Sequence, residues 1–194
     1  METEKLSDVE LVAIALRKPI ERAAGIVRDS GSLRGLLNKP HEDVTEHERE
    51  ILAAIKELGR RYLKEALIGQ NFIRSPQAVT DYLMASLRDE KREIFKVIFL
   101  DKSLRILTVR DLFFGTIDEA AVHPREIVKA ALMADASNIV LCHNHPSGKI
   151  EPSREDYEIT QKIKQACATV SVRVLDHIII GENQYFSFSE RNSL

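Results

Sequence analysis

Several features that mark particular protein classes are scarce or missing in this sequence of 194 residues. Its two cysteines, Cys142 and Cys167, are too few for a disulfide framework, so we expect reduced thiols and a cytoplasmic protein. No apolar run approaches the roughly 18–20 residues that cross a bilayer, and the acidic, polar start is unlike a signal peptide. The net charge of −2 argues against electrostatic binding of polyanions by the chain as a whole.

The first part of the sequence shows only helical patterns. Capping boxes at Ser7 and Thr45, a proline at position 19 and a Gly31-Ser32 break predict helices over about 9–16, 19–28, 33–37 and 46–67. The segment Gly69-Gln70-Asn71 then interrupts the helical spacing. We therefore expect a small all-helical domain over residues 1–68.

From residue 72 the patterns of helices and strands alternate. We expect helices over about 77–87, 125–134 and 153–168, and strands over 93–100, 104–109, 138–142, 172–180 and 184–188. An irregular stretch is expected to begin at Phe113-Phe114, and Ile127, Val128, Ala131 and Leu132 should face inward. This order predicts an α/β domain with a mixed sheet over residues 72–194, with Cys142 as a buried thiol in its core.

The strongest chemical pattern is His143-Asn144-His145, followed after seven residues by Ser153 and then Asp156. Two imidazoles at the end of a strand can reach one metal ion, and Asp156 falls on the same helix face as Ser153. Each residue alone has an ordinary role, since Ser153 is a good helix cap and Asp156 favours a helix N-terminus. Together, three protein ligands leave one zinc coordination position open, which is typical of catalytic sites.

This set resembles the JAMM signature of the MPN-plus metalloproteases in order and spacing. The surrounding sequence is similar, more narrowly, to RadC, the bacterial branch. The motifs that carry this resemblance are HNHPSG at 143–148, PSRED at 152–156, VHPREI at 122–127 and LDHIIIG at 175–181. The segments LSDVEL at 6–11 and GSLRGLL at 31–37 extend it to the start of the chain. It implies a JAB/MPN fold, which is cytidine-deaminase-like, after the helical domain.

The resemblance also implies a Zn²⁺ ion held by His143, His145 and Asp156, with water as the fourth ligand. Family sites use a glutamate at the start of the first sheet strand, and the matching position is Glu93, with Glu90 as its nearest rival. Glu93 would then act as the general base on the water, and Ser153 would donate a hydrogen bond to the oxyanion. The expected reaction is hydrolysis of a peptide or isopeptide bond in a peptide or protein substrate. Asp176 and His177, on opposite faces of a strand, are expected to have a supporting or structural role rather than to bind the metal.

A non-enzymatic alternative is a DNA-repair-associated or partner-binding protein with a structural or vestigial metal site. RadC helical regions resemble helix-hairpin-helix modules, which bind phosphates through a glycine-containing hairpin. Residues 38–50 contain no glycine here, and residues 1–70 carry 12 basic and 13 acidic residues. Nucleic acid is therefore a weakly supported partner, and the helical domain is interpreted as a degenerate module of this kind. The sequence does not specify an oligomeric state.

Overall fold

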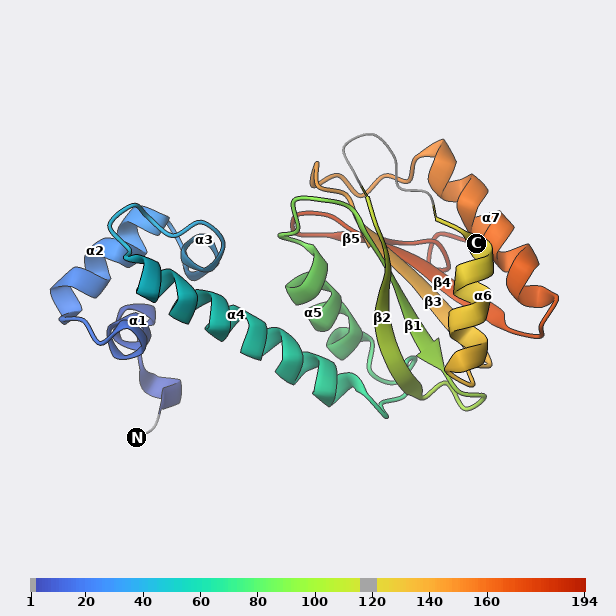
Figure 1. Cartoon of the computed structure of the whole chain (residues 1–194), viewed down its shortest axis with the longest axis horizontal. Helices are drawn as coiled ribbons and strands as arrows, with labels where there is room; N and C mark the ends of the chain where they lie inside the picture. Colours follow the sequence, from blue (N-terminus) through green and yellow to red (C-terminus); the bar gives the residue numbers. More distant parts are fainter. Residues whose placement is uncertain (1–2, 116–121) are drawn as a thin grey trace. The chain divides into compact units, whose positions relative to one another are not determined.

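The computed structural model describes residues 3–115 and 122–194, and its contacts divide the chain into two units within helix α4 (Figure 1). The first unit extends to Arg61 and the second begins at Tyr62. The expected linker at residues 69–71 begins two residues after the end of α4 at Leu67. The predicted domain boundaries at 68 and 72 stay a prediction.

The first unit is helical, as the sequence indicates. Its elements are a short 3-10 helix η1 (Thr3–Lys5), α1 (Asp8–Leu16), α2 (Ile20–Ser30), α3 (Leu33–Asn38) and the first part of α4 (Glu46–Leu67). The capping box at Ser7 is confirmed, because its hydroxyl accepts the Glu10 N–H while Glu10 accepts the Ser7 N–H. Apolar side chains from these helices form a core of their own, centred on Ala23, Leu36 and Leu52.

The second unit is built on one five-stranded sheet in the order β2-β1-β3-β4-β5. Its elements in chain order are α5 (Pro76–Leu87), β1 (Ile94–Leu100), β2 (Ile106–Phe114), α6 (Pro124–Met133), β3 (Asn138–Asn144), α7 (Arg154–Ala168), β4 (Arg173–Ile180) and β5 (Tyr185–Ser187). Strands β3 and β4 are parallel and the other pairs are antiparallel, which confirms the predicted mixed sheet.

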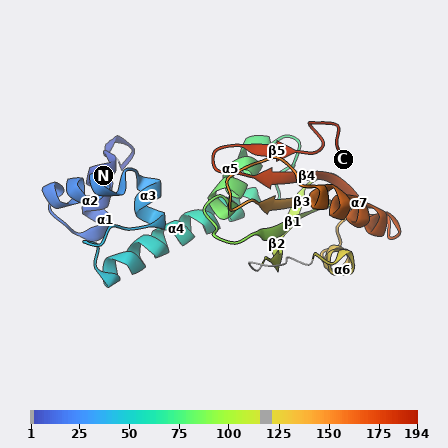
Figure 2. The same ribbon diagram turned by 90° about the horizontal axis from the view of Figure 1, so that it is seen from above.

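Helices cover both faces of this sheet, with α5 on one face and α6 and α7 on the other (Figures 1 and 2). The central strands are buried throughout because each face packs against a helix layer. Val140 and Cys142 belong to the core on the α5 face, and Ile139 and Leu141 to the core on the α6–α7 face. This alternation places His143 on the α7 face and Asn144 on the α5 face. Cys142 is fully buried as expected, and burial raises the pKa of its thiol well above the ordinary value.

Two local predictions were wrong. Strand β2 continues to Phe114, so the irregular stretch does not begin at Phe113. Phe113 and Phe114 belong to the strand because they pair with Phe95 and Ile94 of β1. The side chain of Leu132 is 53% exposed, and Ala130 takes the buried position instead. Thr116, which was also assigned to the irregular stretch, lies outside the described residues.

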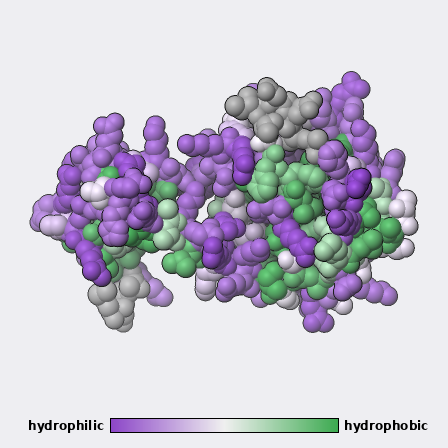
Figure 3. Space-filling view, viewed as in Figure 1, coloured by the Kyte–Doolittle hydropathy of each residue, from purple (hydrophilic) through white to green (hydrophobic). Residues whose placement is uncertain are grey.

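The surface mixes hydrophilic and hydrophobic side chains (Figure 3). Large exposed apolar residues of the second unit include Leu107, Phe114, Leu132 and Met133. Among the described residues, no helix has the length and apolar character needed to cross a membrane.

Candidate metal centre

His143 and His145 come from the end of β3, beside its parallel neighbour β4. His143 is the last but one residue of the strand and is fully buried, with its ring stacked on Phe95 at 6.0 Å between ring centroids. His145 follows the strand, and its backbone N–H continues the ladder by donating to the carbonyl of Ile180. The two Nε2 atoms lie 3.0 Å apart, so both imidazoles point to the same spot.

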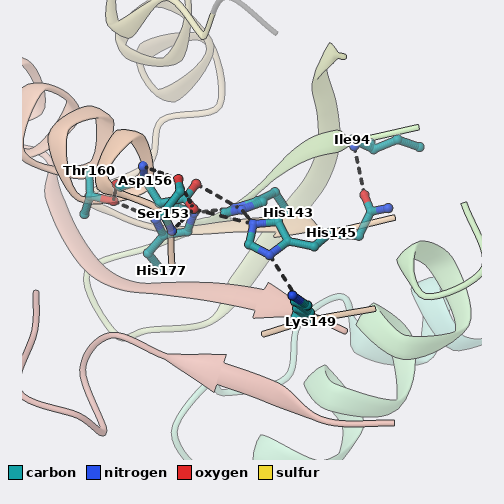
Figure 4. A network of polar contacts seen from close by, with 9 residues as sticks. Ile94, His143, His145, Lys149, Ser153, Asp156, Thr160 and His177 are labelled. Carbon is teal, nitrogen blue, oxygen red and sulfur yellow. Dashed lines mark hydrogen bonds and ion pairs between the residues drawn. The ribbon is translucent and has the colours of Figure 1, made fainter. Parts of the chain in front are cut away.

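Asp156 approaches that spot from the first turn of α7. The predicted cap is present: the Ser153 hydroxyl accepts the Asp156 N–H, and the Asp156 carboxylate accepts the Ser153 N–H at 2.7 Å. This reciprocal pairing fixes the side chain of Asp156 where the helix begins. Its Oδ1 lies 3.1 Å from His143 Nε2, and its Oδ2 lies 3.5 Å from His145 Nε2 (Figure 4).

These three residues can together hold a divalent metal ion. One ligand atom from each of His143, His145 and Asp156 lies within 4.8 Å of the other two. The Nδ1 of His145 faces the carbonyl of Lys149 at 3.0 Å, and a carbonyl only accepts, so Nδ1 carries a proton. In the neutral ring the lone pair is then on Nε2, where it can bind a metal. The chemistry of this donor set therefore fits a first-row metal such as zinc.

The electrostatics of the site favour a positive charge among the three side chains. Burial alone raises the pKa of Asp156, but hydrogen bonds from the protonated forms of His143 and His145 outweigh it and hold that pKa well below the usual range. Asp156 in turn raises the pKa of His145, with a smaller contribution from the negative charge of Glu93. A metal ion would compete with protons for the imidazole nitrogens and would meet an ionised carboxylate.

Glu93 lies beside the same site, immediately before β1. It lines a cavity of about 560 Å³ with His145, Ser153 and Asp156. Further lining residues are Phe95, Val122, Glu155, Glu158, Ile159 and Lys162. The structure thus brings together all five residues singled out from the sequence, with His143 buried directly behind His145 and Asp156.

The Ser153 hydroxyl donates at 2.7 Å to Oδ2 of Asp156. Its proton is therefore directed at the Asp156 carboxylate. That Ser153 donates a hydrogen bond to an oxyanion remains a prediction.

Three polar residues support the site, and sequence reasoning named only one of them. His177, which was expected to have a supporting or structural role, lies 2.8 Å from His143 between their ring nitrogens. Thr160 contacts His177 and was missed, although its position four residues after Asp156 places it on the same helix face. Asn144 was missed as well; its amide binds the segment that leads into β1.

Fold and site together define the class of protein: a helical N-terminal region precedes an α/β domain with a candidate His-His-Asp metal site. Comparison with known families gives a match between residues 73–193 and the RadC-like JAB domain. The chain belongs to this family, as its motifs indicated.

The curated relatives carry an uninformative name, "UPF0758 protein". One from Stutzerimonas stutzeri is 44% identical over 95% of this chain and 88% of its own length. Another from Tolumonas auensis is 44% identical over 97% of this chain and 90% of its own length, and one from Aeromonas hydrophila is 41% identical over the same shares. The similarity therefore covers both units of the chain and assigns no activity.

Proposed function

We propose that this protein is a zinc-dependent metallopeptidase or isopeptidase that hydrolyses an amide bond of a peptide or protein. The observation that carries the proposal is the convergence of His143 Nε2, His145 Nε2 and the Asp156 carboxylate beside an open cavity that also contains Glu93. Three protein ligands leave a coordination position for water or substrate, as in catalytic zinc sites. The resemblance of the motif to the JAMM signature supports the same reaction class.

Each residue would have a distinct part in the reaction. A zinc ion, when bound, would supply Lewis acidity and lower the pKa of a coordinated water towards about 7. Glu93 would take the proton of the attacking water and pass it to the leaving amine, because its carboxylate borders the cavity next to His145. Ser153 would hold Asp156 in place, and would donate to the oxyanion once its hydroxyl turned from Asp156 to the substrate.

Separating metal binding from proton transfer tests this proposal. We expect Glu93→Gln to keep bound zinc and to lose activity by about 10²–10⁴-fold, the usual contribution of a general base. Asp156→Ala should lose both zinc and activity. Glu90→Gln is the matched control, because Glu90 is close in sequence but does not line the cavity. The measurements are metal content of the purified full chain and cleavage of a peptide library.

Two results would overturn the assignment. Unchanged hydrolysis in both Glu93→Gln and Asp156→Ala would exclude the proposed chemistry. If wild-type protein prepared with excess zinc contained no bound metal, the non-enzymatic alternative would be favoured, in which the protein acts in DNA repair or binds a partner. Salt-dependent binding to duplex or branched DNA would support that alternative.

A further inference from the structure

His143 is oriented by a chain of buried hydrogen bonds that begins at its ring nitrogen opposite the candidate metal. Its Nδ1 lies 2.8 Å from Nε2 of His177 in the neighbouring strand β4. The Nδ1 of His177 lies 2.6 Å from the Thr160 hydroxyl, which donates at 2.5 Å to the backbone carbonyl of Asp156. His143, His177 and Thr160 are all fully buried, so water does not compete for these bonds.

The donor and acceptor of each hydrogen bond can be assigned by starting from the bond between Thr160 and Asp156. A carbonyl only accepts, so the single proton of the Thr160 hydroxyl points to Asp156. The hydroxyl oxygen must then accept from Nδ1–H of His177. With its proton on Nδ1, a neutral His177 presents a lone pair at Nε2, which accepts from Nδ1–H of His143. In neutral His143 the Nε2 is thereby left without a proton.

We propose that Thr160 and His177 are positioning residues that fix the tautomer of His143 and keep its Nε2 available as a metal ligand. This inference rests on the proposed metal site and deepens it. Metal-binding histidines usually donate the N–H of their second ring nitrogen to a carboxylate, a carbonyl or water, and His145 does so to the carbonyl of Lys149. His143 instead depends on a second imidazole, which itself can adopt either tautomer, so Thr160 is needed to choose between them.

The chain of hydrogen bonds also closes on the metal site itself. The Thr160 hydroxyl donates to the backbone of Asp156, whose carboxylate is the third ligand candidate. One helical turn of α7 therefore supplies both a ligand and the group that orients another ligand, because Asp156 and Thr160 are four residues apart (Figure 4). Loss of the hydroxyl should disturb His143 through His177 and leave the Ser153–Asp156 cap intact.

Zinc affinity of the full chain, measured by competition with a chromophoric chelator, tests this inference without any substrate. Thr160→Val keeps the shape of the side chain but removes both hydrogen bonds, and we expect zinc to bind about 10–100-fold more weakly. Thr160→Ser keeps the hydroxyl and should restore wild-type affinity. Ser86→Ala is the matched control, since it removes a buried hydroxyl that donates to the Leu83 carbonyl within α5 rather than to a residue of the metal site or of this chain of hydrogen bonds.

A second readout separates tautomer control from a merely structural role. In ¹⁵N spectra of the histidine rings, wild-type His143 and His177 should both carry their proton on Nδ1. Thr160→Val should change this pattern for His177, while Ser86→Ala should not. His177→Gln keeps an acceptor for His143 and should bind zinc more tightly than His177→Leu; equal affinities would overturn the role of His177.

The outcomes distinguish this inference from the proposed function. A folded Thr160→Val protein with wild-type zinc affinity and unchanged ring spectra would overturn the inference and leave the hydrolase proposal standing. Weakened zinc binding in a protein that cleaves no peptide would support the inference and count against the hydrolase. A wild-type protein that binds no zinc would overturn both.

Discussion

Asn144, the residue between the two histidines, has a role unlike that of its neighbours. Its side chain is buried on the α5 face of the sheet, where Oδ1 accepts the Ile94 N–H at 2.8 Å. Its Nδ2 donates to the carbonyls of Arg92 and Glu90 at 3.1 and 3.4 Å. Asn144 thus ties down the backbone on both sides of Glu93, about fifty residues upstream, and fixes where the candidate base enters the site.

Replacing Asn144 should affect the position of the candidate base, Glu93, without affecting metal binding. Asn144→Ala leaves the buried Ile94 N–H without its partner, so we expect a loss of roughly 1–3 kcal/mol in the free energy of unfolding. Hydrolytic activity should fall while zinc affinity stays close to that of the wild type, because His143 and His145 keep their own hydrogen bonds. Urea unfolding and chelator competition measure the two effects. A loss of zinc affinity equal to that of Asp156→Ala would contradict this assignment.

At the residue scale the sequence identified the candidate ligands, but of the residues that support them it indicated only His177. Imidazoles and a carboxylate at H-x-H and S-x-x-D spacing form a donor set suited to a divalent metal, so His143, His145 and Asp156 could be predicted. Thr160 and Asn144 are common polar residues with no distinctive spacing. Apart from the Asp156 carbonyl, which accepts from Thr160 within α7, their partners lie in other elements or far away in sequence, and hydrogen bonds of that kind depend on packing.

At the scale of elements, the loop after β3 depends on close backbone contact with the end of β4. The position of a Cβ atom added at Gly181 would be only 2.5 Å from the Gly148 carbonyl oxygen and from Cγ2 of Ile150. Between those two residues lies Lys149, whose carbonyl holds the ring of His145. Glycine at position 181 therefore allows the loop to approach β4 and orient a candidate ligand.

A pair of glycine substitutions tests this contact. Gly181→Ala should cost about 1–3 kcal/mol through the displaced backbone, and should weaken zinc binding by shifting Lys149. Gly59→Ala is the matched control, because a Cβ there meets nothing within 4 Å and lies inside α4. It should stabilise the protein by roughly 0.5–1 kcal/mol without changing zinc affinity. Equal stability and zinc affinity in Gly181→Ala and the wild type would show that the loop is free to move.

Local signals predicted the elements well where their causes are local. Helices α1 and α7 begin at the serines whose hydroxyls cap them, and their first turns need no distant partner. Strand β2 was predicted to end too early, because its last residues are in a strand only through pairing with β1. The exposure of Leu132 was missed for a related reason, since helical spacing does not tell how wide the covered face is.

At the scale of the whole molecule, the two units have separate apolar cores, and the candidate metal site among the described residues lies in the second. A ligand that binds only the folded form stabilises the unit that holds it. The four tyrosines all lie at or after residue 62, so their signal reports on the second unit alone. This distribution makes the two units spectroscopically separable in the full chain.

Removal of zinc should therefore destabilise one unit selectively. With free zinc at about 100 times its Kd, the metal contributes roughly 2.7 kcal/mol to the stability of the second unit. A chelator should lower the melting temperature followed by tyrosine near-ultraviolet circular dichroism, and leave a far-ultraviolet transition of the first unit unchanged. Asp156→Ala protein, treated in the same way, should show no shift. One common transition that moved as a whole would contradict independent units.

The sequence by itself determined the fold class, the order of elements and the candidate ligands, because helix caps, hydrophobic periodicity and ligand spacing are local properties of the chain, and its motifs indicated the family by resemblance. Only the tertiary structure decided how His143 is oriented and where Glu93 lies. Those features depend on hydrogen bonds between β1, β3, β4 and α7, which form only when the sheet and its helices pack together. The chain supplies the ligands as a short motif, and the packed fold sets the proton positions on which their use as ligands depends.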